Sequence, residues 1–288
     1  MNPYLFIVGC PRSGTTLLRR MVDAHALIAI TRETHWIPDM ARAGGALDLG
    51  GRVTAKLPGL LLAHPKFATL GIHPEDVERL AAGRPSYPAF VTALFDLYGA
   101  RCGKPHVGDK TPGYVKEIGF LHDAFPHARF VHLVRDGRDV CLSALEWERK
   151  AEQFRRRFPG WEDAPVATAA RWWRSHVMEG RASCRRLTED LYLELRYEAL
   201  VADPEGECRR LCEFLRVAFD PAMLRFHEGR RRFDPGLSAK HAWLPPTPGL
   251  RDWRTQMSRD QVEEFEDAAG DALDAFGYPR AVRVREES

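Results

Sequence analysis

The sequence lacks a long apolar run, and it contains little cysteine. No stretch is apolar over the roughly 20 residues that a membrane helix needs, and Met1 is not followed by a basic, cleavable leader. The six cysteines show no paired C-x-x-C spacing and are too sparse in 288 residues for a disulfide scaffold. We therefore expect a soluble, cytoplasmic protein with reduced thiols and no membrane partner.

Net charge is almost absent as well. The 42 lysines and arginines are balanced by 40 aspartates and glutamates, which leaves a formal net charge of +2. Such a balance gives no global attraction to nucleic acid, so we expect no nucleic-acid partner. Any binding of an anion must come from a local arrangement of residues.

A candidate for such an arrangement lies close to the N-terminus. The apolar run Tyr4 to Val8 predicts a buried strand, and the apolar spacing after residue 16 predicts a helix. Between them, Gly9 to Thr16 has the spacing of the phosphate-binding loop G-x-x-x-x-G-K-[ST], with Thr15 in place of the lysine. Gly14 would let the backbone approach an anion, and the charged fork of Arg12 suits an oxyanion. The alternative interpretation is a strand-to-helix turn without a ligand.

Strands and helices alternate along the rest of the chain. This order predicts an α/β fold of the P-loop type, with a mainly parallel central sheet flanked by helices on both faces. The length is at the upper end for one domain, so we expect a single domain over 1–288. The further strands are predicted at Ala26 to Ile30, from His106, at Ala128 to Val134 and at Leu191 to Tyr197, and later helices at Trp161 to Leu187, Pro204 to Leu215 and Ser258 to Phe276.

Two segments depart from this alternation. Residues 37–105 are divided by glycines and prolines into short helical pieces, such as Pro74 to Ala82 and Tyr87 to Tyr98. We interpret them as a helical insertion, which either shapes an acceptor pocket or only pads the sheet. Residues 230–256 are rich in Pro, Gly, Trp and Arg, and we interpret them as a loop that closes over the site. The basic run Arg149 to Arg157 is expected on a solvated face.

A second candidate anion site follows the strand that ends at Val134. Arg135 stands at the strand end and Ser143 lies in the following helical stretch, so both can converge on one phosphate. A surface ion pair between Arg135 and Asp136 is the alternative interpretation.

Together the two motifs resemble those of sulfotransferases that use 3′-phosphoadenosine 5′-phosphosulfate (PAPS). The motifs are Cys10-Pro-Arg-Ser-Gly-Thr-Thr-Leu-Leu18 and Leu133-Val-Arg-Asp-Gly-Arg-Asp-Val-Cys-Leu-Ser143. The resemblance implies that the first motif binds the 5′-phosphosulfate and the second the 3′-phosphate. The residues to which it assigns nucleotide binding are Arg12, Ser13, Gly14, Thr15, Thr16, Arg135 and Ser143.

A finer resemblance is to the tyrosylprotein sulfotransferase branch. The triplet Asp23-Ala24-His25 and the pair Glu33-Thr34 match that pattern, and the pattern implies that Glu33 is the general base. His35 is the competing base, and a plain ion pair of Glu33 with Arg32 or Arg12 is the non-catalytic alternative.

Three further segments resemble family motifs. Lys110, in Asp109-Lys-Thr-Pro112, would donate to the leaving phosphate and, with Arg12, offset the charge that develops there. Tyr197 matches a tyrosine beside the adenine, although a core tyrosine is the alternative. Arg251 and Arg254, in a late G-x-x-x-W-R segment, would cap the 3′-phosphate.

The resemblance thus implies transfer of a sulfuryl group from PAPS to an acceptor hydroxyl, with no metal. The rivals are a P-loop kinase that uses ATP and Mg²⁺, against which the missing lysine argues, and a nucleotide-binding protein without catalysis. Phenols, sugars, lipids, antibiotic scaffolds and peptide tyrosines all fit as acceptors.

Overall fold

The centre of the computed structural model is a sheet of five parallel strands in the order β2-β3-β1-β4-β5. The structure describes residues 1–148, 158, 160–228, 244–247 and 249–281. The strands are β1 (Leu5–Gly9), β2 (Ile28–Ile30), β3 (His106–Lys110), β4 (Arg129–Val134) and β5 (Tyr192–Arg196). The predicted α/β class and the parallel sheet are confirmed.

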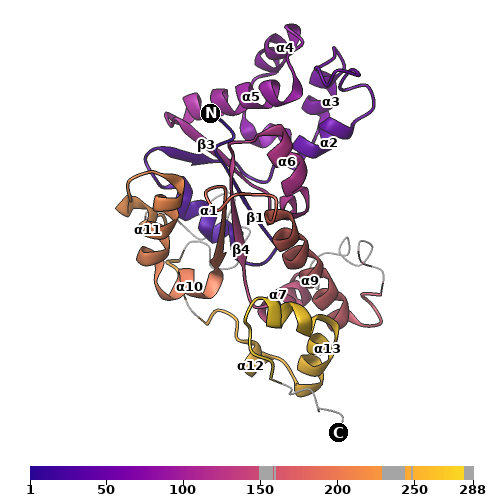
Figure 1. The fold of residues 1–288 in the computed structure, drawn as a ribbon, viewed down its shortest axis with the longest axis vertical. Coiled ribbons are helices and arrows are strands. Elements are labelled where there is room, and N and C mark those ends of the chain that lie inside the picture. Colours follow the sequence, from indigo (N-terminus) through magenta and orange to yellow (C-terminus); the bar gives the residue numbers. More distant parts are fainter. Residues whose placement is uncertain (149–157, 159, 229–243, 248, 282–288) are drawn as a thin grey trace.

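Helices cover both faces of this sheet because alternate side chains of its strands are buried on opposite faces. In β1, Leu5 and Ile7 pack with α1 (Thr15–Asp23), α10 (Tyr197–Ala202) and α11 (Pro204–Leu215). Phe6 and Val8 pack on the other face with residues of the 3-10 turn η2 (Pro112–Glu117) and of α6 (Ile118–Ala124). Figure 1 shows α10 and α11 on one side of the sheet and α6 on the other.

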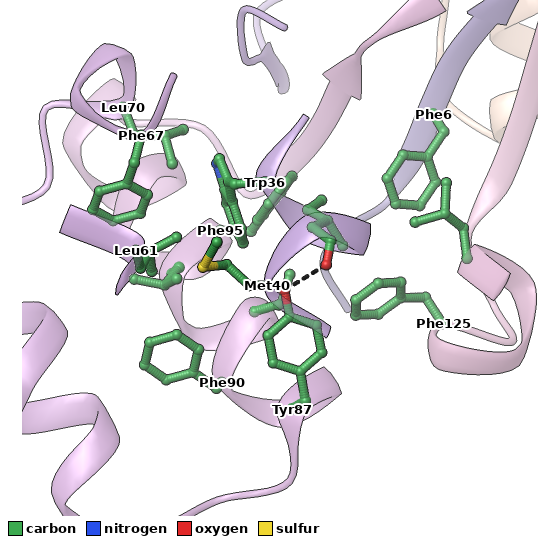
Figure 2. Close-up of a cluster of buried hydrophobic side chains, with 14 of the residues drawn as sticks. Phe6, Trp36, Met40, Leu61, Phe67, Leu70, Tyr87, Phe90, Phe95 and Phe125 are labelled. Carbon is green, nitrogen blue, oxygen red and sulfur yellow. Dashed lines mark hydrogen bonds between the residues drawn. The ribbon is translucent and has the colours of Figure 1, made fainter. Parts of the chain in front are cut away.

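The segment predicted as a helical insertion shares a core with the sheet. Its helices are α2 (Trp36–Arg42), α3 (Leu57–Ala63), α4 (Pro74–Ala82) and α5 (Tyr87–Cys102), with a 3-10 turn η1 (Phe67–Leu70), and they gather at one end of the molecule in Figure 1. Trp36 and Phe67 meet edge to face at 5.7 Å, within the same buried cluster as Phe6 (Figure 2). The predicted helices are confirmed, except that α5 continues past Tyr98 to Cys102, where Gly103, with a positive φ of 66°, ends it.

A third buried cluster lies at the opposite end of the molecule. It joins α7 (Gly137–Glu148), α9 (Pro165–Cys184), α12 (Trp253–Gln256) and α13 (Arg259–Ala275). Trp173 is fully buried there, and Ser258 caps α13 with a capping box that it forms with Gln261. The prediction for Trp161 to Leu187 is wrong at both ends, because Pro165 holds the first turn of α9 and the helix stops at Cys184. A last 3-10 turn, η3 (Pro221–Met223), packs against α1.

Some predictions lie outside the described residues. They are the basic run Arg149 to Arg157 and most of the loop over 230–256, of which 244–247 and 249–256 are described. No helix within the described ranges is both long and apolar enough to cross a bilayer.

His132, in the middle of β4, makes stability depend on pH. The ring is fully buried, and burial lowers its pKa to about 3. The unfolded chain therefore takes up a proton below about pH 6.5 that the folded protein does not, so stability falls as the pH falls. Between pH 7 and pH 5, we expect wild type to lose about 2 kcal/mol more than His132→Asn, as measured by urea unfolding. An equal loss in both proteins would contradict this prediction.

Candidate functional site

All five strands end at the same edge of the sheet, and the predicted site residues follow these ends. The phosphate-binding loop follows β1, Glu33 lies three residues beyond β2, Lys110 closes β3, Arg135 follows β4 and Tyr197 follows β5. In open parallel sheets, ligands bind at this edge. The fold thus brings to one edge residues that lie more than 180 positions apart in the sequence.

The loop between β1 and α1 has a backbone that ordinary side chains would not permit. Gly9 has φ 150°, and a Cβ there would lie 2.4 Å from the carbonyl oxygen of Leu133. Gly14 has φ 94°, and a Cβ there would lie 2.4 Å from the ring of Tyr197. Arg12 adopts φ 78°, which is uncommon for a non-glycine residue and concentrates at functional sites. The loop is therefore fixed by contact with β4 and with Tyr197.

The two predicted anion motifs meet in space. Arg12 Nε donates to Ser143 Oγ over 3.0 Å, although the two residues are 131 positions apart. Ser13 is fully buried, and its Oγ has no hydrogen-bonding partner among the described residues. A buried polar atom without a hydrogen-bonding partner is typical of a site that receives a ligand.

Arg135 is held in place from three sides. Its guanidinium lies 4.2 Å from the centre of the Tyr197 ring and 3.3 Å from Asp139 Oδ2, and its carbonyl oxygen accepts a hydrogen bond from Trp173 Nε1 at 3.1 Å. Its Nε is buried and without a partner within the described part of the chain. The alternative of a surface pair between Arg135 and Asp136 is wrong, because Arg135 is buried and pairs with Asp139.

Asp136 belongs instead to a buried ionic cluster that sequence reasoning missed. Arg138 is fully buried, its Nη2 is 2.8 Å from Asp136 Oδ2 and its Nη1 is 2.8 Å from Glu266 Oε1. Trp253 stacks on the guanidinium at 3.6 Å and donates from Nε1 to Asp136 Oδ2 at 3.1 Å. No local pattern marks Glu266 or Trp253 as partners of Arg138, since they lie more than 110 positions away.

Glu33 and Lys110 form an ion pair at the neighbouring strand ends. Lys110 Nζ donates to Glu33 Oε1 over 2.6 Å, and His35 Nε2 lies 3.4 Å from Glu33 Oε2. The Lys110 side chain is 6% exposed and that of Glu33 is 40% exposed. The alternative of an ion pair between Glu33 and Arg32 or Arg12 is thus wrong, because the partners of Glu33 are Lys110 and His35.

The environment sets the charge of this pair. Burial raises the pKa of Glu33, but the hydrogen bond with His35 and the charge of Lys110 outweigh it and lower the pKa to about 2. The pKa of Lys110 lies below its ordinary value, because the effect of burial, which lowers the pKa, exceeds that of the nearby Glu33 carboxylate, which raises it. Glu33 is therefore ionised at neutral pH. Its carboxylate is held by the Lys110 ammonium, and it would have to leave that cation in order to act as a base.

The two late arginines differ in position. Arg251 pairs with Glu146 on α7 and lies near Arg12, whose pKa is lowered first by burial and then by the charge of Arg251. Arg254 is 63% exposed, lies over Trp253 and sits 3.7 Å from Asp252. The structure therefore brings Arg251, but not Arg254, to the phosphate-binding loop.

The comparisons with known proteins point to one family. Residues 3–221 match the model of the sulfotransferase family. Protein-tyrosine sulfotransferase A of Caenorhabditis elegans is 27% identical over 227 residues, which cover 79% of this chain and 53% of that protein. The chain spans about half the length of several protein-tyrosine sulfotransferases that it matches.

Solved structures agree with this assignment. The sulfotransferase domain of the olefin synthase from Synechococcus PCC 7002 has a TM-score of 0.61 and 26% identity, covering 92% of this chain and 94% of that one. The sulfotransferase domain of the curacin biosynthetic pathway has a TM-score of 0.63 and 22% identity, covering 97% of this chain and 99% of that one, and so shares the fold. The matched residues 3–221 include the phosphate-binding loop, Arg135 and Ser143. This chain therefore belongs to the sulfotransferase family.

Proposed function

We propose that this protein transfers a sulfuryl group from PAPS to an acceptor hydroxyl, which yields PAP (adenosine 3′,5′-bisphosphate) and a sulfate ester. The observation that carries the proposal is the convergence of two anion-binding motifs beside an acid–base pair. Arg12 bonds to Ser143, Arg135 lies at the adjacent strand end, and Glu33 pairs with Lys110. A donor with a phosphate on the 3′ oxygen and a phosphosulfate on the 5′ oxygen of its ribose needs two anion-binding sites. ATP, with its phosphates on the 5′ oxygen, needs one.

The nucleotide roles follow from the position of each group. The loop residues Ser13, Gly14, Thr15 and Thr16 would hold the 5′-phosphosulfate at the start of α1, where the helix dipole favours negative charge. Arg135 and Ser143 would hold the 3′-phosphate. The unpartnered buried atoms, Ser13 Oγ and Arg135 Nε, support this assignment because they lie in the two motifs that would receive the anions.

The acid–base roles follow from the ion pair. Lys110 would turn from Glu33 to the oxygen that bridges sulfur and phosphorus, and with Arg12 it would stabilise the charge that develops on PAP. Release from Lys110 removes a nearby cation, so the pKa of Glu33 rises toward its ordinary value. Glu33 then takes the proton of the acceptor hydroxyl as its oxygen attacks sulfur and the bond from sulfur to the phosphate oxygen breaks.

The remaining roles are proposed with the same reaction. Tyr197 would border the adenine, and Arg251 would close over the 3′-phosphate, whereas the position of Arg254, 63% exposed beside Asp252, does not support that role for it. The helices α2 to α5 would shape the acceptor pocket. A phenolic or alcoholic hydroxyl, of a small molecule or of a peptide tyrosine, is the proposed acceptor, and the cytoplasmic location and metal independence stay predictions.

The test is titration calorimetry with PAP and then with ATP, in EDTA. We expect wild type to bind PAP without metal, and Arg135→Ala to bind it about 100-fold more weakly, because charge-assisted hydrogen bonds to a phosphate are lost. Arg209→Ala, which removes an exposed arginine of α11, serves as the control and should bind PAP like wild type. Equal affinity in Arg135→Ala and wild type would remove the 3′-phosphate site. Binding of ATP that requires Mg²⁺ would favour a kinase instead.

A further inference from the structure

The backbone pairing of β2 and β3 ends before it reaches the acid–base pair. The last register partners are Ile30 and Gly108, and the last backbone hydrogen bond runs from Thr31 N to the carbonyl oxygen of Gly108 at 2.9 Å. Glu33 and Lys110 lie two to three residues further on. Lys110 is held by its pairing with Ile7 of β1, so the position of Glu33, whose Oε1 lies 2.6 Å from Lys110 Nζ, must be fixed by contacts beyond the β2–β3 backbone pairing.

Side chains continue the pairing where the backbone stops. Thr31 Oγ1 donates to Asp109 Oδ2 over 2.8 Å, and Thr34 N donates to Thr111 Oγ1 over 2.9 Å. All four residues are fully buried. One bond lies on each side of the acid–base pair, since Thr31 and Thr34 flank Glu33 while Asp109 and Thr111 flank Lys110.

Tyr114, at the start of the turn after β3, completes this arrangement. Its hydroxyl lies 2.8 Å from Thr34 Oγ1 and accepts a hydrogen bond from Ile37 N at 3.2 Å. The ring is 2% exposed and lies edge to face with His35 at 6.4 Å. The segment between β2 and α2 carries Glu33 and His35, and we call it the Glu33 connector. The Tyr114 hydroxyl thus links this connector, at Thr34, to the first turn of α2, at Ile37.

We propose that Thr34 and Tyr114 are positioning residues, whose buried hydrogen bond holds the Glu33 connector in register with Lys110. The inference rests on the proposed function, because it gives these hydroxyl groups a role only where Glu33 is the base. Neither hydroxyl contacts the phosphate-binding loop in the structure. Loss of either hydroxyl should therefore affect the chemical step and not nucleotide binding.

Three variants test the inference by removing or retaining one hydroxyl each. Tyr114→Phe and Thr34→Val should lower kcat about 10- to 100-fold, because small displacements of a catalytic group cost rates of this order, with the KM for PAPS and the affinity for PAP unchanged. Thr34→Ser keeps the hydroxyl and should restore kcat. The double variant should be no worse than the poorer single variant, because both single changes break the same bond. Turnover is read as PAP formed from PAPS with p-nitrophenol as acceptor.

Tyr87→Phe is the matched control. Its hydroxyl is also buried and donates to the carbonyl oxygen of Ile37 at 2.6 Å, the dashed bond from Tyr87 in Figure 2, but it does not reach Thr34. It should lose stability without losing kcat. A wild-type kcat in Tyr114→Phe, or an equal loss in Tyr87→Phe, would overturn the inference.

Hydrogen exchange gives a readout that needs no acceptor. The amides of Thr34 and Ile37 should exchange faster in Tyr114→Phe and in Thr34→Val than in wild type or Thr34→Ser. Unchanged exchange would overturn the inference even if p-nitrophenol is not sulfated. Failure of wild type to bind PAP would instead overturn the proposed function on which the inference rests.

Discussion

Glu33→Gln should lower kcat by about 100- to 10,000-fold, the range that a positioned general base contributes. Glutamine keeps the size and the polarity of the side chain but cannot take up the hydroxyl proton. Binding of PAP should persist, because the two proposed anion-binding motifs remain intact. Single-turnover formation of PAP from PAPS, compared with the calorimetric affinity for PAP, separates the two effects.

His35→Gln is the companion variant, because His35 is the other candidate base and lies 3.4 Å from Glu33. A base at Glu33 predicts a far smaller loss in His35→Gln than in Glu33→Gln. Full activity in Glu33→Gln, with a large loss in His35→Gln, would move the base to His35. PAP affinity measured on both variants shows whether the nucleotide site is intact.

Arg138→Met should cost about 3–5 kcal/mol of unfolding free energy, because it removes a buried guanidinium that pairs with two buried carboxylates. Asp136 and Glu266 both pair with this fully buried guanidinium, and Trp253 stacks on it. Urea unfolding at pH 7 measures the loss. The cluster lies next to Arg135, so we also expect weaker binding of PAP by the folded fraction.

Arg174→Met is the matched control for this prediction. Arg174 donates from Nε and Nη2 to the carboxylate of Asp271 between α9 and α13, but their side chains are 44% and 52% exposed. Exposed pairs contribute about 0–1 kcal/mol, because water screens the charges. Similar losses in Arg138→Met and Arg174→Met would contradict a special role of the buried cluster.

The local features of this protein were predictable from short stretches of sequence. The loop from Gly9 to Thr16 needs glycines at fixed positions, and those positions can be counted along the chain. The strand before it, the helices Pro74–Ala82 and Pro204–Leu215 and the capping box at Ser258 likewise depend on residues within a few positions of one another. Such signals survive in the sequence because the interactions that cause them are local.

Other features were decided by the tertiary structure alone. Arg12 meets Ser143 across 131 positions, Arg138 meets Glu266 across 128, and Thr31 meets Asp109 across 78. Each pair joins segments that lie far apart in the sequence and that only the folded chain brings together. A single arginine or threonine looks the same in the sequence whether it is paired or solvated, since its partner is chosen by the topology of the chain and by the burial that excludes water.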